Sequence, residues 1–285
     1  MKRSEFRHLE RLRVRWAEVD LQKIVFNGHY LMYFDTAVAG YWRAMAMPYH
    51  QTMAQLGGDL FVRKATLEYL ASAQYDDLLD VGIRCGRIGN SSLRLHAAVF
   101  RGDTLLVGGE LVYVFANPAT QTSRPVPAGL RTLLHDFEAG QAMVEVRVGG
   151  WDALGRDAQR IRSTVFIDEQ RIPAELEWDA ADAQCVHAVA YNRFGTAVAT
   201  GRLLQHAPGV ARIGRMAVLQ GLRGAAIGRA ILDALVEAAR QRGDREVLLH
   251  AQASAAGFYA RAGFTARGEP FDEVGIAHLE MARAL

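Results

Sequence analysis

The sequence predicts a protein of two domains, an α+β domain followed by an α/β domain, and three observations support this fold class. First, 285 residues are long for a single core and comfortable for two domains of ordinary size. Second, residues 117–129 (NPATQTSRPVPAG) are rich in Pro, Thr, Ser and Gly, which is typical of a loop. Third, the two halves show no internal repeat. We therefore expect a boundary near Gly140, with domains at residues 1–140 and 141–285.

The composition is that of an ordinary globular protein. Hydrophobic residues make up 50% of the chain and charged residues 22%, and the net charge of +2 gives no reason to expect nucleic acid as a partner. We expect no membrane contact and a cytoplasmic location, because no apolar run could span a bilayer and the N-terminus lacks the apolar core of a signal peptide. Cys85 and Cys185 are expected to be buried thiols, and no motif suggests a metal site.

The first half is expected to fold as one strand, one long helix and four further strands. Leu12, Val14 and Trp16 alternate with arginines, which indicates a half-buried strand. From about Gly28 to Met47 apolar side chains recur three or four residues apart, which predicts a helix that ends near Pro48. The four strand-like runs that follow are Leu60 to Leu70, Leu78 to Ile88, Ser92 to Arg101 and Leu105 to Phe115.

A shorter helix is expected to close the first half. Leu130, Leu133 and Phe137 recur at helical spacing, and Gly140 is suited to end the element. A strand from Met143 to Val148 then opens the second half.

Two segments of the first half resemble the 4-hydroxybenzoyl-CoA thioesterase family, whose hotdog fold wraps an antiparallel sheet around a long helix. They are VRWAEVDLQKIVFNGHYLMYFD (residues 14–35) and FVRKATLEYLASAQYDDLLDV (residues 61–81). The family signature D-x-D-x-x-G-I-V-Y/F appears here as residues 18–26. Asp20 keeps the catalytic position, while Glu18 replaces the first Asp and Lys23 the usual Gly, a departure that bears on the local turn. The resemblance implies that Asp20 is catalytic.

The chemistry of this site can be stated from the residues. A carboxylate just before a helix can attack a thioester carbon or activate a water, and position alone does not separate these roles for Asp20. Backbone N–H groups near Asn27 and Gly28, at the expected helix start, can stabilise the resulting oxyanion. The alternative is that Asp20 only caps a turn or the helix.

Residues 220–243 of the second half (QGLRGAAIGRAILDALVEAARQRG) are expected to form a turn and then a helix whose first residues have small side chains. Unpaired backbone N–H groups and the helix dipole at such a start suit a pyrophosphate. Arg223 can add charge-assisted contacts. The small residues at the start are Gly224, Ala225, Ala226 and Gly228. The apolar face expected to be buried is formed by Ile227, Ile231, Leu232, Leu235, Val236 and Ala239.

This pattern resembles motif A of the GNAT superfamily of N-acetyltransferases, Q/R-x-x-G-x-G/A, which have a mixed central sheet flanked by helices. It reads Arg223-x-x-Ala226-x-Gly228, with Ala in place of the first Gly. Residues 251–264 (AQASAAGFYARAGF) resemble motif B, and residues 165–182 with 271–281 resemble the ElaA-type branch. The resemblance implies that Tyr259 is the general acid toward the CoA thiolate. It also implies a coenzyme A site, with Val218 and Leu219 along the pantetheine and the pyrophosphate at Arg223, Gly224, Ala225, Ala226, Ile227 and Gly228.

Alternatives remain open in this half. Tyr259 is alternatively a packed aromatic beside Phe258 and Phe264. No general base is fixed by spacing, and Glu169, Glu175 and Glu177 are interpreted as loop carboxylates on a solvated surface. The candidate bases are Glu177, Asp179, His187 and His278.

Together the two resemblances imply a bifunctional enzyme of CoA thioesters. Acyl-CoA would be hydrolysed by the first domain, and the second would transfer acetyl from acetyl-CoA to an amine, with no metal. Because hotdog domains pair their sheets, we expect a homodimer or higher homo-oligomer. One alternative is a thioesterase regulated by a non-catalytic CoA-binding GNAT module. The other is a non-enzymatic scaffold for acyl-CoA or an acyl carrier protein.

Overall fold

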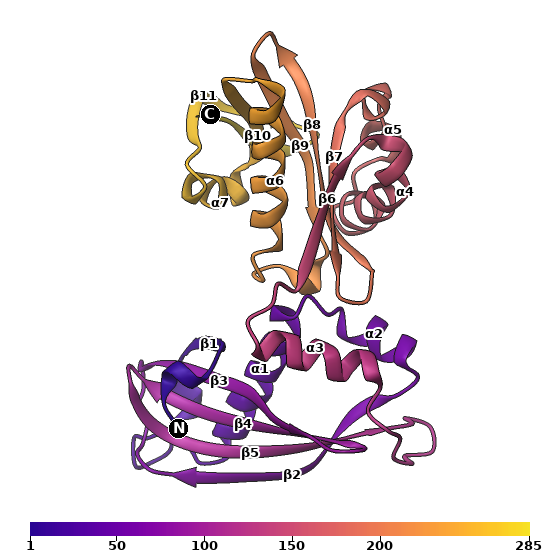
Figure 1. Ribbon diagram of the computed structural model, residues 1–285. Coiled ribbons are helices and arrows are strands. Elements are labelled where there is room, and N and C mark those ends of the chain that lie inside the picture. Colours follow the sequence, from indigo (N-terminus) through magenta and orange to yellow (C-terminus); the bar gives the residue numbers. More distant parts are fainter. The chain divides into compact units, whose positions relative to one another are not determined.

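A five-stranded antiparallel sheet against one long helix forms the N-terminal unit of the computed structural model, which describes residues 1–285 (Figure 1). The strand order β1-β3-β4-β5-β2 leaves β1 and β2 as the two edges. The strands are β1 (His8–Arg13), β2 (Asp59–Tyr69), β3 (Leu78–Ile88), β4 (Ser92–Arg101) and β5 (Thr104–Ala116). The helices are α1 (His29–Ala44), α2 (Tyr49–Leu56) and α3 (Ala128–Glu138), with 3-10 turns at Arg3–Glu5 and Trp16–Glu18.

The long helix α1 packs on the concave side of this sheet through side chains three or four residues apart. Phe34, Ala37 and Tyr41 are fully buried along that face. The helix ends at Ala44, earlier than expected, because Ala46 has a left-handed backbone (φ 53°). Pro48 then precedes α2, a second helix that the sequence analysis did not predict.

The first strand was predicted too far along the chain, because the expected strand at Leu12 to Trp16 lies in the structure at His8–Arg13. β1 ends at Arg13, and Trp16 lies in a 3-10 turn with its side chain 76% exposed. The side chain of Glu18 accepts a hydrogen bond from the Arg15 N–H at 2.8 Å. This local bond favours the turn over continued strand and explains the error.

A seven-stranded mixed sheet forms the C-terminal unit, in the order β11-β12-β10-β9-β8-β7-β6. Only β9 and β10 run parallel. Its strands are β6 (Val144–Gly149), β7 (Val186–Asn192), β8 (Ala197–Ala207), β9 (Val210–Val218), β10 (Glu246–Gln252), β11 (Thr265–Glu273) and β12 (Ile276–Ala284). Its helices are α4 (Trp151–Arg162), α5 (Ala174–Glu177), α6 (Ile227–Arg242) and α7 (Ala256–Arg261). A π-helix (Ser163–Glu169) continues α4, and 3-10 turns lie at Ala180–Gln184, Gln220–Leu222 and Ala253–Ala255.

The helices α4 and α6 both pack on the central strands of this sheet (Figure 1). Ile231 and Leu235 of α6 lie against Gly201 of β8, where a Cβ atom would meet them at 2.9 and 2.8 Å. Close approach of the helix therefore requires glycine at this position. The predicted apolar face of α6 is buried.

The parallel strands β9 and β10 separate halfway along their length. They pair only from Val210 with Glu246 to Ile213 with Leu249. Beyond this point β9 contains a bulge against β8, and Arg215 within it has a left-handed backbone (φ 52°). The separation opens the sheet between the two strands.

The predicted fold class, an α+β unit followed by an α/β unit, is confirmed. The chain divides into two compact units between Met143 and Val144. Cys85 and Cys185 are free thiols. No helix is long and apolar enough to cross a membrane, and no group of three or more His, Cys, Asp or Glu side chains is arranged to hold a metal ion.

Candidate functional sites

An open cavity of the N-terminal unit lies beside the start of α1. Asp20, Asn27 and Tyr30 line it from the α1 side, and Tyr69 and Leu70 line it from the end of β2. The wall combines apolar and polar groups, with a carboxylate among them, which suits a ligand that has an apolar body and a polar reactive group.

The Asp20 carboxylate both shapes a turn and borders this cavity. One oxygen accepts a hydrogen bond from the Gln22 N–H at 2.8 Å, so the capping alternative is realised with that oxygen. The other oxygen has no partner within the protein. Lys23 donates its N–H to the Asp20 carbonyl at 2.9 Å, with a left-handed backbone (φ 62°). The turn that the family builds with Gly is therefore kept with Lys.

Glu18 holds the loop behind Asp20, a role that the sequence analysis did not assign. Its side chain is buried and accepts hydrogen bonds from the Tyr33 hydroxyl at 2.7 Å and the Arg15 N–H at 2.8 Å. Burial by itself raises the pKa of Glu18, but these hydrogen bonds and the Arg15 charge outweigh it and hold the pKa below its ordinary value. The Glu18 carbonyl also accepts the Phe26 N–H at 2.9 Å, which closes the loop.

The amides expected to stabilise an oxyanion are free at the start of α1. Gly28 precedes the helix without a side-chain cap, and neither the Asn27 nor the Gly28 N–H donates a hydrogen bond within the protein. Asn27 lines the cavity together with Asp20. The structure thus brings the carboxylate and an unpartnered amide to one cavity.

The start of α6 in the C-terminal unit also presents unpartnered amides. The first bond of the helix runs from Ala230 to Ala226, which leaves the N–H groups of Gly224, Ala226, Ile227 and Gly228 without partners. Gly224 (φ 87°) and Ala226 (φ 59°) both have left-handed backbones. Ala226 therefore adopts the conformation of the glycine it replaces.

Two of the groups that were expected to bind coenzyme A beside the start of α6 already make hydrogen bonds within the protein. Arg223 pairs with Glu169 through two contacts of 2.7 Å and donates from Nε to the Val218 carbonyl at 3.2 Å. The Leu219 N–H donates to Val198 at 3.1 Å. Arg223 reaches a ligand only by releasing Glu169.

Tyr259 lines a second cavity, of about 220 Å³, where β9 and β10 separate. The side chain is 8% exposed and its hydroxyl has no hydrogen-bond partner. Burial raises the pKa of Tyr259 to about 12, so the phenol stays protonated at neutral pH. The ring also packs against Phe258 (4.9 Å between centroids) and Phe264 (6.1 Å), so packing and an available hydroxyl coexist.

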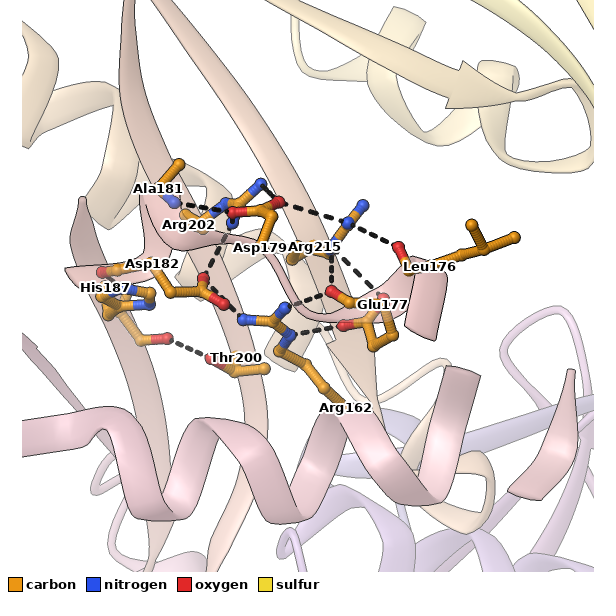
Figure 2. Close-up of polar contacts among 11 residues, drawn as sticks. Arg162, Leu176, Glu177, Asp179, Ala181, Asp182, His187, Thr200, Arg202 and Arg215 are labelled. Atoms are coloured by element: carbon orange, nitrogen blue, oxygen red, sulfur yellow. Dashed lines mark hydrogen bonds and ion pairs between the residues drawn. The ribbon is translucent and has the colours of Figure 1, made fainter. Parts of the chain in front are cut away.

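Glu177 and Asp179 belong to a network of ion pairs rather than to a free surface (Figure 2). The fully buried Arg162 donates to Glu177 at 2.5 Å and to Asp182 at 2.8 Å. Arg202 joins Asp179 at 2.7 Å and Asp182 at 2.8 Å. The interpretation of Glu177 as a solvated loop carboxylate is wrong, since the residue is 2% exposed.

The network also reaches the β9 bulge and His187. Arg215 donates to the Glu177 carbonyl at 3.3 Å (Figure 2). His187 contacts the Asp182 carbonyl through Nε2 at 2.9 Å, and burial lowers its pKa. Glu177, Asp179 and His187 therefore have structural partners, whereas His278 borders the cavity with Nδ1 on the Ile276 carbonyl at 2.8 Å.

His250 is a residue of this cavity that the sequence analysis missed. It lies on β10 directly after the last residue paired with β9 and is half-buried. The signal available in the sequence was a histidine that follows the apolar run Val247–Leu249 inside a strand.

Comparisons with known proteins match each unit separately. The family model for the acetyltransferase (GNAT) domain matches residues 156–285, and that for the thioesterase superfamily matches residues 22–108, which begin two positions after Asp20. The N-acetyltransferase YjcF of Bacillus subtilis, itself uncharacterized, is 35% identical over 129 residues, which cover 45% of this chain and 91% of YjcF.

Two further proteins are similar to one unit each. An Aquifex aeolicus protein, named only provisionally as an esterase, is 29% identical over 93 residues, which cover 33% of this chain and 72% of that protein. The crystal structure of Escherichia coli ElaA has a TM-score of 0.45 and 27% identity, and it covers 50% of this chain and 99% of ElaA.

Proposed function

The chain belongs to the GNAT acetyltransferase family through its C-terminal unit and carries a thioesterase-superfamily domain in its N-terminal unit, and from this premise we propose two CoA-thioester reactions. The N-terminal unit hydrolyses an acyl-CoA, and the C-terminal unit transfers acetyl from acetyl-CoA to an amine. One observation supports both: each unit has unpartnered amides at the start of its long helix and a cavity holding a side chain suited to the reaction.

In the N-terminal unit the reacting group is the Asp20 carboxylate. It either attacks the thioester carbonyl or takes a proton from a water that attacks. The Asn27 and Gly28 amides donate to the oxygen that becomes negative, and the thiolate of CoA leaves when the carbonyl re-forms. The apolar wall near Tyr30 and Leu70 holds the acyl group.

In the C-terminal unit acetyl-CoA is the substrate that fits the start of α6. The pyrophosphate accepts hydrogen bonds from the unpartnered amides at the start of α6, those of Gly224, Ala226, Ile227 and Gly228, and Arg223 exchanges Glu169 for a phosphate. The pantetheine arm runs along Val218 and Leu219 into the separation of β9 and β10. Tyr259 gives its proton to the departing thiolate, and its raised pKa keeps that proton available.

The proposal is tested by binding and turnover on the whole chain. Calorimetry measures CoA binding, and thiol release from a panel of acyl-CoA thioesters is followed with and without amines. Thiol release without amine, together with N-acetylated product when amine is added, supports both reactions. CoA binding without acetyl transfer supports the regulatory module instead, and the absence of both reactions supports a scaffold.

We expect Tyr259→Phe to lower amine-dependent thiol release by about 10²-fold or more while CoA affinity and thermal stability stay unchanged. The hydroxyl has no partner in the protein, so its loss leaves no buried group unpaired. Mass spectrometry of the N-acetylated amine measures the effect. The exposed Tyr75→Phe is the matched control. An unchanged rate of acetyl transfer in Tyr259→Phe would show that Tyr259 only packs against its neighbours and is not the general acid.

We also propose that two copies pair through the β2 edge of the N-terminal sheet. This edge strand exposes apolar side chains, with Val62 57% and Tyr69 52% exposed, and its end lines the Asp20 cavity. Light scattering should give twice the chain mass, and Val62→Asp should give the single mass. Val148→Asp, on an edge strand of the other sheet and 46% exposed, is the control. A monomeric wild type contradicts the pairing.

A further inference from the structure

The cavity at the separation of β9 and β10 contains one guanidinium that has no carboxylate partner. Of the two arginines that line it, Arg215 is paired with Glu177 at 3.2 Å and with Asp179 at 3.5 Å. Arg212 has only a contact of 3.5 Å with His250 Nδ1. A half-buried, unpaired guanidinium facing a cavity is a binding group for a carboxylate or another anion.

Two glutamates also contact the His250 ring. Glu273 of β11 is 3.5 Å from His250 Nδ1, and Glu280, the ladder partner of His250 on β12, is 3.9 Å from Nε2. The Arg212 guanidinium and the Glu273 carboxylate both contact Nδ1, whereas Nε2 has only the longer contact with Glu280, so Nε2 is the nitrogen that remains available to a ligand. The cavity thus presents the positive Arg212 and the negative Glu273 beside one imidazole.

The imidazole is suited to accept a proton. Burial lowers the pKa of His250, and the Arg212 charge lowers it further, while Glu273 and Glu280 oppose the shift. These three charges are contributed by β9, β11 and β12, and the same cavity is also lined by Tyr259, His278 and the paired Arg215 and Glu177. His250 is therefore neutral at pH 7, the form that a general base requires.

We propose that the acceptor of the C-terminal unit is a free amino acid, whose carboxylate binds Arg212 and whose amine is deprotonated by His250. The inference rests on the proposed acetyl transfer and adds the substrate class and the base. Glu273 and Glu280 attract the ammonium form, and the apolar wall at Phe166, Ile172 and Leu176 receives an apolar side chain.

The step balances without a further reactant. His250 takes one proton from the ammonium, and the freed lone pair forms the bond to the acetyl carbon. The carbon–sulfur bond then breaks, and the thiolate takes its proton from Tyr259. The second amine proton passes to bulk water, and the proton on His250 returns through solvent to the Tyr259 phenolate. The products are an N-acetyl amino acid and CoA.

The test compares phenylalanine with phenethylamine, two probes that differ only in the carboxylate. We expect wild type to acetylate phenylalanine with a kcat/KM at least 10-fold higher, in line with a charge-assisted bidentate contact. Arg212→Met should abolish this preference by raising the KM for phenylalanine while phenethylamine turnover persists. The exposed Arg245→Met is the matched control.

The base is tested by rate and by pH profile. His250→Gln should lower kcat for both probes by about 10²- to 10⁴-fold and remove the acid limb of the profile, with CoA affinity retained. Arg212→Met should move that limb to higher pH, because it removes a charge that lowers the pKa of His250. The exposed His206→Gln is the control.

The outcomes separate this inference from the proposed function. A preference that survives in Arg212→Met, or an unchanged rate and pH profile in His250→Gln, overturns the inference and leaves acetyl transfer standing. So does a wild type that acetylates amines but none of phenylalanine, leucine and methionine. A wild type that neither binds CoA nor releases thiol with any amine overturns the proposed function, and the inference falls with it.

Discussion

Asp20→Asn will lower acyl-CoA hydrolysis by about 10²- to 10⁴-fold and leave amine-dependent acetyl transfer at the wild-type rate. The amide oxygen of Asn still accepts the Gln22 N–H, so the turn beside the cavity persists. What is lost is the negative charge, which both the nucleophilic route and the water route require. Amine-independent thiol release measures the first activity, and N-acetylated product measures the second.

The matched control for this variant is Asp103→Asn, on the exposed turn between β4 and β5. It should hydrolyse acyl-CoA like wild type. A wild-type rate of acyl-CoA hydrolysis in a folded Asp20→Asn variant would show that Asp20 only caps the turn and is not catalytic. A single turnover in ¹⁸O-labelled water adds a distinction between the two routes, because label enters the Asp20 carboxylate only when a covalent intermediate forms and water attacks its aspartyl carbonyl.

Arg162→Met will destabilise the C-terminal unit by about 3–5 kcal/mol. Arg162 is 1% exposed and is paired with Glu177 and Asp182, both of which are also buried. Methionine keeps the apolar volume of the side chain, so the cost comes from two buried carboxylates that lose their common cation. Urea unfolding should show one transition shifted to lower denaturant and the other unchanged, because the chain divides into two compact units, each of which we expect to unfold on its own.

Lowering the pH should reduce the loss of stability in Arg162→Met. Burial raises the pKa of Glu177 above its ordinary value, and Arg162 is the first of the charges that oppose the rise. Without Arg162 the folded-state pKa rises further above the unfolded value, so the penalty grows as pH increases through the folded pKa and shrinks below it. The control Arg160→Met, with a side chain 51% exposed, should cost at most about 1 kcal/mol. Equal shifts in both variants would contradict a role for the buried network.

Local pattern was sufficient for most of the fold. The sequence predicts β3 as Leu78–Ile88 and β4 as Ser92–Arg101, the bounds found in the structure, because apolar residues recur at alternate positions over most of each strand. It missed α2, whose start depends on a left-handed Ala46 that no residue preference announces. The end of β1 was wrong because a side-chain hydrogen bond to Arg15 competes with strand pairing.

The candidate sites likewise contain some features that the sequence predicts and others that it does not. Backbone amides at helix starts follow from small residues at a recognisable spacing, so the amides of Asn27 and Gly228 were predictable. The partners of Glu177 were not, because Arg162 lies 15 positions away and the contact depends on a π-helix and a loop between them. His250 gains its significance only from neighbours on β9, β11 and β12, which pairing of distant strands brings together.

Lys23 and Ala226 have a consequence for how such chains are recognised. Both stand where the two family signatures have glycine, and each holds a left-handed backbone at a cost of order 1 kcal/mol. A signature that requires glycine at these positions would fail to match this chain, although its backbone has the conformation that glycine favours. Torsion angles are therefore a more durable signature of these two positions than the letters of either motif.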